Sequence, residues 1–214
     1  MKKDLVEMIF ILDRSGSMAG LEKDTIGGFN QMISKQKVVK GEALVSTVLF
    51  DHEFQVIHNR KLIKEVDLMT QEQYFVRGTT ALLDAVGRSI TKMVSIYRKL
   101  KDQDKPEKTI FVITTDGMEN ASKEYTYQKI KELIEFQKEK FNWEFIFLGA
   151  NIDAIRTASL FGIGEDRAVN YHSDEVGTAL NYKVIEEAIS DIRINKSIRT
   201  NWKEEINKDF KNRK

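Results

Sequence analysis

Hydrophobic residues fall into short continuous runs, separated by longer segments in which they recur every three or four residues. The runs with the length and composition of buried strands are Met8–Leu12, Leu44–Phe50, Thr109–Thr115 and Glu144–Leu148. Because these runs do not alternate with polar residues, we expect both faces of each strand to be covered, as in a parallel sheet. Phe54–His58 follows the second run closely and predicts an antiparallel hairpin partner, and Arg167–Tyr171 predicts a weaker sixth strand.

The segments between the runs have the periodicity of amphipathic helices. Helices are predicted over Gly20–Lys37, from Leu82 to Tyr97, around Ile130–Ile134, over Asp153–Phe161 and from Val176 to Ile192. Strands that alternate with helices are typical of a doubly wound, Rossmann-like α/β domain. We therefore expect a three-layer sandwich with helices on both faces of the sheet.

Composition narrows the class of protein. The 34 basic and 33 acidic residues give a net charge of +1, without the basic surplus of a protein that binds nucleic acid. The chain has no cysteine, which excludes disulfides and thiolate chemistry. No stretch approaches the ~18 apolar residues of a membrane span, and Asp4 and Glu7 interrupt the first apolar run, which we interpret as a strand and not an export signal. We expect a cytoplasmic protein that binds neither nucleic acid nor membrane.

Two of the predicted strands run directly into side chains that carry oxygen. The first is followed by Asp13, Ser15 and Ser17, and Thr109–Thr115 is followed by Asp116. Ligands bind at the carboxyl edge of open α/β sheets, where the strand order reverses. Carboxylates and hydroxyls without His or Cys form a hard, all-oxygen set that suits Mg²⁺, Mn²⁺ or Ca²⁺. The sequence therefore predicts a divalent-cation site, with Mg²⁺ as the first expectation.

The same residues carry a family resemblance. Asp13-Arg14-Ser15-Gly16-Ser17 is similar to the Asp-X-Ser-X-Ser signature of von Willebrand factor A and integrin inserted domains. Arg77-Gly78-Thr79-Thr80 resembles the glycine–threonine loop of that family, and Thr115-Asp116-Gly117 resembles its distal aspartate. The resemblance extends from about Lys3 to Ser190. It implies a mostly parallel six-stranded sheet in the order 3-2-1-4-5-6 with strand 3 antiparallel, in agreement with the strands predicted above.

In that family these residues form a metal-ion-dependent adhesion site. The resemblance implies that Ser15, Ser17 and Thr79 coordinate the ion directly and that Asp13 and Asp116 act through water or change between direct and indirect contact. It also implies that an acidic side chain of a protein partner fills the last coordination position. Either threonine of the Thr79-Thr80 pair is also suited to cap the following helix, but the family pattern places the ligand directly after the glycine. Glu119 and Asn120 are close enough in sequence to line the site.

The expected function is cation-dependent protein binding and not catalysis. No placed histidine or cysteine offers a base or nucleophile, and Ser15 stands where an aspartyl phosphotransferase would need a second carboxylate. Two alternatives stay open. One is a Mg²⁺-dependent hydrolase or phosphotransferase that uses Asp13 or Asp116, and the other is a structural subunit of a larger complex with a degenerate site.

The end of the chain lies outside the family pattern. We assign residues 1–194 to the von Willebrand factor A-type domain and residues 195–214 to a basic C-terminal extension. In the extension Trp202, Ile206 and Phe210 recur every four residues. This spacing predicts a short amphipathic helix that docks on the domain or on a partner.

Overall fold

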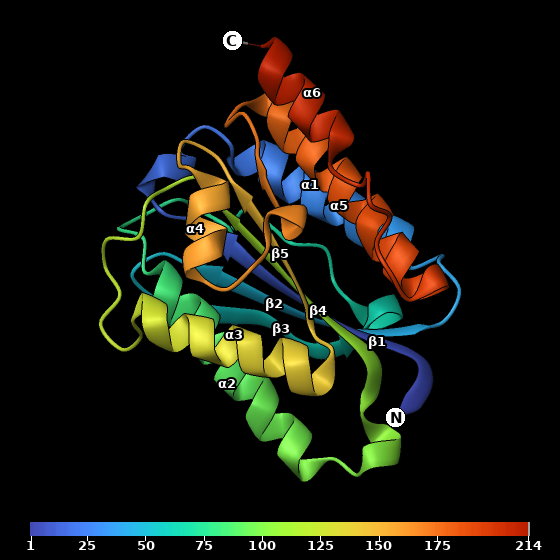
Figure 1. Cartoon of the computed structure of the whole chain (residues 1–214). Coiled ribbons are helices and arrows are strands. Elements are labelled where there is room, and N and C mark those ends of the chain that lie inside the picture. The colour runs from blue at the N-terminus through green and yellow to red at the C-terminus, as the bar shows by residue number, and fades with distance from the viewer. Residues whose placement is uncertain (214) are drawn as a thin grey trace.

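The computed structural model describes residues 1–213, in which a single sheet lies between two layers of helices (Figure 1). The strands are β1 (Lys2–Asp13), β2 (Glu42–Phe50), β3 (Phe54–Leu62), β4 (Pro106–Thr115), β5 (Glu144–Gly149) and β6 (Ala168–Asn170). Their order in the sheet is β3-β2-β1-β4-β5-β6. β2 and β3 pair antiparallel, and the other neighbours pair parallel. The predicted fold class, strand order and antiparallel strand are confirmed.

In the part of the chain that the structure describes, six α-helices cover the sheet. They are α1 (Glu22–Gln36), α2 (Leu82–Lys99), α3 (Tyr127–Phe141), α4 (Ala154–Leu160), α5 (Glu175–Asn195) and α6 (Glu204–Asn212). α1, α5 and α6 belong to the hydrophobic core on one face, and α2, α3 and α4 to the core on the other. The two cores enclose the sheet on both sides, as the uninterrupted apolar runs predict.

The central strand β1 shows why its apolar run is continuous. Met8, Phe10 and Leu12 pack into the core beneath α1 and α5, whereas Ile9 and Ile11 pack into the core beneath α2 and α3. Each of these side chains is at most 1% exposed. Because successive side chains point to opposite faces of a strand, β1 is held from both sides up to its last residues. The end of β1 is therefore a rigid support for the loop that follows Asp13.

Two strands extend beyond the apolar runs that predict them. β1 begins at Lys2, whose backbone N–H donates to the Lys105 carbonyl at 2.7 Å, although its side chain is exposed. β3 continues to Leu62 along the sheet edge, with register shifts against β2 and a positive φ of 51° at Arg60. In both places backbone hydrogen bonds continue the ladder where side-chain burial has stopped, and a hydrophobic pattern does not detect this.

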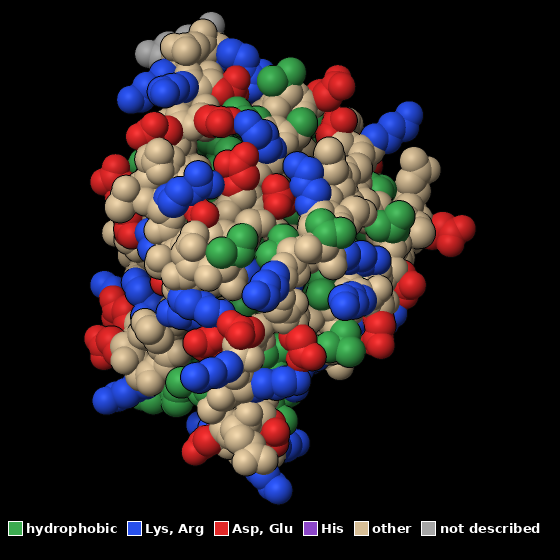
Figure 2. Space-filling model, turned by 90° about the vertical axis from the view of Figure 1, so that its right-hand side faces the viewer, with side chains coloured by type: hydrophobic (Ala, Val, Ile, Leu, Met, Phe, Trp, Pro, Cys, Tyr) green, Lys and Arg blue, Asp and Glu red, His purple; other side chains and the backbone are tan. Residues whose placement is uncertain are grey.

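Within the predicted extension, α6 lies along α5 and next to β6 (Figure 1). Trp202 and Ile206 are buried in the core, and Phe210 is 38% exposed. On the face shown in Figure 2, acidic and basic side chains are interspersed, as the near-zero net charge suggests. Among residues 1–213, no helix combines the length and the hydrophobicity needed to span a bilayer.

Candidate metal centre

The strands β1 and β4 end side by side at the carboxyl edge of the sheet. Leu12 pairs with Thr114 in the parallel ladder, so Asp13 and Asp116 leave the sheet at neighbouring positions. Each of these aspartates is 1% exposed. The chain continues to β2 on one side of β1, while β4 lies on the other side, and this is the switch point at which α/β sheets bind ligands.

The loop after β1 brings two hydroxyl groups together. The Ser15 N–H donates to Asp13 Oδ1 at 2.7 Å, and a turn of 3₁₀ helix, Gly16–Met18, follows. The Oγ atoms of Ser15 and Ser17 lie 3.1 Å apart. The Gly16 N–H donates to the Gly78 carbonyl at 3.1 Å, and a Cβ on Gly16 would stand only 3.3 Å from that oxygen. Glycine at this position therefore allows the two loops to approach closely.

The third hydroxyl group comes from Thr80. Its Oγ1 donates to Ser15 Oγ at 2.9 Å, and the residue is 3% exposed. Thr79 is exposed. Gly78 adopts a left-handed φ of 69°, and the chain leaves this turn with Thr79 outward and Thr80 inward. The structure therefore brings Thr80 into the cluster and leaves Thr79, the threonine expected from the sequence, outside it.

Asp116 and Gly117 close the cluster from the β4 side. A Cβ on Gly117 would lie 2.8 Å from Ser17 Oγ and 3.1 Å from Thr80 Oγ1, so the glycine backbone packs directly on these hydroxyls. Asp116 Oδ2 accepts a hydrogen bond from Ser173 Oγ at 3.0 Å. Asp116 Oδ1 is buried and has no hydrogen-bond partner within residues 1–213. One oxygen of this buried carboxylate is thus left free to contact a ligand.

The two aspartates are buried without a compensating positive charge. Burial raises the pKa of Asp13 to about 6, against the hydrogen bonds from Thr115 and Ser15, and the nearby Asp116 raises it further. Burial also raises the pKa of Asp116. Among residues 1–213, no lysine, arginine or histidine pairs with either aspartate. Such a pair is unfavourable as the protein stands and becomes favourable when a cation joins it.

The donor set fits a hard divalent cation. Ser15, Ser17, Thr80, Asp13 and Asp116 supply oxygen atoms only, which suits Mg²⁺ or Mn²⁺ better than a soft metal. No group of three or more His, Cys, Asp or Glu side chains in the described part of the chain is placed to hold a metal. A metal in this protein would therefore rely on hydroxyl groups as well as carboxylates, as the sequence predicts.

A buried ion pair that the sequence did not reveal braces the threonine loop. Arg14, the second residue of the Asp-X-Ser-X-Ser segment, is 0% exposed, and its Nε donates to Asp51 Oδ2 at 2.8 Å. Arg77 Nε donates to the same oxygen at 2.9 Å. Although burial acts in the opposite direction, hydrogen bonds from Glu53, Arg77 and Arg14 hold the pKa of Asp51 below its usual value. The pair of arginines on Asp51 ties the loop after β1 to the loop that carries Thr80.

Glu119 and Asn120 have structural contacts. Glu119 Oε2 accepts from the Leu83 N–H at 2.9 Å, in the first turn of α2. Asn120 Oδ1 accepts from the Thr80 N–H at 2.9 Å. These side chains satisfy free N–H groups at and just before the start of α2. Asn120 positions Thr80, and the oxygens of both side chains are occupied by these contacts.

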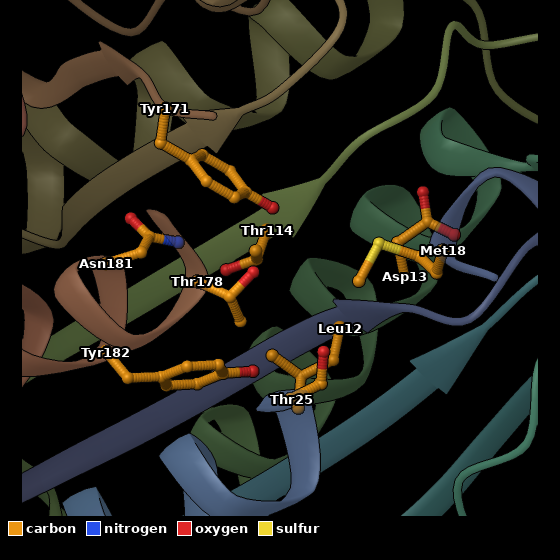
Figure 3. Close-up of a pocket in the computed structure, with 9 residues that line it drawn as sticks. All are labelled: Leu12, Asp13, Met18, Thr25, Thr114, Tyr171, Thr178, Asn181 and Tyr182. Carbon is orange, nitrogen blue, oxygen red and sulfur yellow. The ribbon is translucent and has the colours of Figure 1, made fainter. Parts of the chain in front are cut away.

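Both apolar and polar side chains line the space behind Asp13, shown in Figure 3. The lining side chains with a buried oxygen or nitrogen that lacks a hydrogen-bond partner are Thr25, Thr114, Thr178, Asn181 and Tyr182. They come from α1, β4 and α5, and Asp13 borders the same space. Asp13 therefore borders a space in which unpaired polar groups lie beside apolar side chains such as Leu12 and Met18, and no basic side chain lines it.

Comparison with known proteins gives the fold class. No family model matches the sequence, and no curated protein matches it. Solved structures do match. The von Willebrand factor domain of a type V pilus tip protein from Porphyromonas gingivalis has a TM-score of 0.61 and 10% identity, over 86% of this chain and 94% of that one. The manganese-loaded TRAP protein of Plasmodium vivax has a TM-score of 0.54 and 14% identity, over 84% and 73%.

A third similar structure is described with a metal in a motif of its own. Proximal thread matrix protein 1 from the mussel byssus, described with a zinc-occupied MIDAS motif, has a TM-score of 0.60 and 12% identity over 85% of this chain. This chain spans about half of that protein, 47% of its length. The three likenesses show that the chain has a von Willebrand factor A-like fold.

Proposed function

We propose that this protein binds one divalent cation, with Mg²⁺ as the first candidate, and uses it to hold an acidic side chain of a protein partner. The observation that carries the proposal is the convergence of three hydroxyl groups on two buried carboxylates that have no positive partner. Manganese and zinc in two of the similar structures support a divalent cation of this kind. Ser15, Ser17 and Thr80 are the proposed hydroxyl ligands, with Thr80 in place of Thr79.

The hydrogen bonds suggest different roles for the two aspartates. Asp13 Oδ1 accepts from the Ser15 N–H at 2.7 Å, and Oδ2 accepts from Thr115 Oγ1 at 2.6 Å. Since both oxygens are already engaged, we assign Asp13 to hydrogen bonds with water that the cation carries. Asp116 has one oxygen without a partner, and we assign that oxygen to direct or water-mediated contact with the cation.

The hydroxyl ligands favour recognition of a partner carboxylate. A cation held mainly by neutral oxygens keeps much of its positive charge, and Mg²⁺ usually retains exchangeable water positions. A carboxylate from outside the chain can therefore replace a water and complete the coordination. Bound in this way, the cation supplies charge attraction, while the chain orients the ligands around it.

We propose binding and not catalysis at this site. Ser15, Ser17 and Thr80 bond to one another, and none of them contacts a histidine in the part of the chain that the structure describes. His52 lies against Gly78, but its Nδ1 is 3.2 Å from Asp51 Oδ1, in the bracing ion pair. A general base next to a hydroxyl nucleophile is the arrangement that catalysis would need.

The test is an affinity experiment with the full chain immobilised, in Mg²⁺ and in excess chelator. Asp13→Asn is the site variant compared with the wild type, because it keeps the size of the side chain and removes its charge. We expect a protein partner that is retained in Mg²⁺, released by chelator and absent from the Asp13→Asn column. A partner that is retained equally in chelator would contradict the proposal and favour a structural subunit with a degenerate site.

A further inference from the structure

The cation site has a contact from a fourth segment, outside the three motif loops. Ser173 lies in the loop between β6 and α5, and its Oγ donates to Asp116 Oδ2 at 3.0 Å. Together with the Ser17 hydroxyl, this hydrogen bond orients the carboxylate, whose Oδ1 has no hydrogen-bond partner among residues 1–213. The position of Ser173 therefore contributes to the orientation of the free oxygen of Asp116.

The opposite side of the same loop is fastened to the C-terminal helix. Asp174, next to Ser173, caps α5 through the Gly177 N–H and also accepts from Arg213 at 2.6 Å. The His172 ring stacks on Phe210 of α6 with ring centres 4.7 Å apart, and its Nε2 is 3.2 Å from the Phe210 carbonyl oxygen. Both neighbours of Ser173 are thus held by the last turn of α6 or by the residue that follows it.

The helix that holds the loop is itself anchored in the core. Trp202, just before α6, donates from Nε1 to the Asp166 carbonyl at 2.8 Å, and Ile206 is 1% exposed. Arg213 is tied to Asp209 as well as to Asp174. The start of α5 also fits tightly on the loop, because a Cβ on Gly177 would stand 2.1 Å from the His172 carbonyl oxygen. The loop therefore has little freedom while α6 is docked.

We propose that Ser173 is a positioning residue of the cation site and that α6, through the loop of residues 171–174, holds it in place. The inference rests on the proposed cation site and adds a regulatory element to it. The C-terminal helix raises the affinity for the cation without touching it. Anything that lifts the end of α6 away from His172 and Asp174 releases Ser173, and the affinity falls.

The expected effects follow from the position of each residue in this chain of contacts. Removing a hydrogen bond to a metal-binding carboxylate typically lowers metal affinity about tenfold or more, so we expect about tenfold for Ser173→Ala. Arg213 contacts Asp174 and acts on Ser173 only through it, so we expect a smaller loss of metal affinity, about threefold, for Arg213→Ala. Lys211→Ala, on an exposed position of the same helix, is the matched control and should leave the affinity unchanged.

The experiment is a double-mutant cycle on the full chain, with Mg²⁺ and Mn²⁺ affinities measured by titration calorimetry after chelator treatment. If Arg213 acts through Ser173, then Arg213→Ala has no further effect in the Ser173→Ala background. Phe210→Ala, which removes the stacking on His172, should repeat the result of Arg213→Ala. Circular dichroism checks that each variant is folded.

The outcomes separate the two proposals. A wild-type chain that binds neither ion would overturn the cation site and this inference with it. A wild-type chain that binds, with Arg213→Ala and Phe210→Ala indistinguishable from Lys211→Ala, would overturn only the role of α6. Losses that multiply in the double variant would also overturn it, because Ser173 and Arg213 would then act independently.

Discussion

Two buried carboxylates on the strand β1 are treated differently by the rest of the chain. Glu7 is 0% exposed, and Arg60 bonds to its Oε2 through Nε at 2.9 Å, with a second guanidinium nitrogen also at 2.9 Å. Burial still raises the pKa of Glu7 to about 7, with Arg60 acting against it. Asp13, at the end of the same strand, is buried just as deeply and has only hydroxyl and N–H partners.

The difference separates an internal structural charge from a charge left for a ligand. Burying a carboxylate is costly unless a positive charge accompanies it. For Glu7 the chain supplies that charge through Arg60 on the neighbouring hairpin. For Asp13 and Asp116 it supplies none, and it surrounds them with hydroxyl groups instead. A site that is unfavourable alone and favourable with a cation is what a metal-binding role requires.

The largest expected effect is the loss of cation binding in Asp13→Asn. At a separation of about 4 Å and an effective dielectric constant of about 20, one charge pair contributes about 4 kcal/mol, or about a thousandfold in affinity. Calorimetric titration with Mg²⁺ measures this loss. Arg60→Gln is the control for general damage to β1 and should retain the wild-type affinity, so an equal loss in both variants would contradict the assignment of Asp13.

The second effect concerns the stability of Arg60→Gln. We expect a loss of about 3 kcal/mol above pH 7, because Glu7 is then buried as an unpaired charge. The pKa of Glu7 in the folded protein, about 7, lies above its ordinary value of 4.5. The stabilising contribution of this group is therefore fully present below pH 4.5 and is lost as the pH rises through 7. Urea unfolding at several pH values should show a loss in Arg60→Gln that grows with pH, and a constant loss would argue against a buried charge.

The third effect distinguishes the two adjacent threonines. Thr80→Ala removes the hydroxyl that contacts Ser15, and we expect cation affinity to fall about tenfold to a hundredfold, by analogy with other residues around metal sites. Thr79→Ala changes an exposed side chain and should leave the affinity within about twofold of wild type. Titration of the two variants side by side measures the difference. The reverse order would restore the family-based expectation for Thr79.

The smallest expected effect is a gain in stability, in cation-free Asp13→Asn. The pKa of Asp13 in the folded, cation-free protein, about 6, lies above its ordinary value of 3.8. The contribution of this group to stability is lost as the pH rises through 6, because the buried carboxyl then becomes charged. An asparagine at this position does not ionise, so its contribution does not change with pH. Cation-free Asp13→Asn should therefore be more stable than wild type at neutral pH, by about 1 kcal/mol after allowance for weaker hydrogen bonds. Thermal unfolding in chelator measures it, and a less stable variant would mean that Asp13 serves the fold and not a ligand.

Much of the fold was predictable, because it depends on patterns that are local in sequence. Runs such as Met8–Leu12 and Thr109–Thr115 are buried on both faces, so their continuous hydrophobicity marks them as central strands. The ends of β1 and β3 were not predictable in the same way. At Lys2 and at residues 61–62 the pairing is made by backbone groups while the side chains are not buried, and every sequence has these groups.

The candidate site was predictable in its residue types and less so in its geometry. The aspartates and serines follow strands, and the strand ends fix their positions. The choice between Thr79 and Thr80 depends on the left-handed turn at Gly78, which neither neighbouring residue type determines. The contacts of Arg14 with Asp51 and of Ser173 with Asp116 join residues far apart in the chain. No local pattern encodes such contacts, and only the fold brings them together.

The central claim is that the uncompensated pair Asp13 and Asp116 is completed by a divalent cation. The most direct measurement is a calorimetric titration of the chelator-treated wild-type chain with Mg²⁺, beside Asp13→Asn. The account predicts a single saturable site in the wild type that is lost in the variant. A wild-type chain that shows no saturable binding of Mg²⁺ or Mn²⁺, or a variant that binds as tightly as wild type, would contradict it.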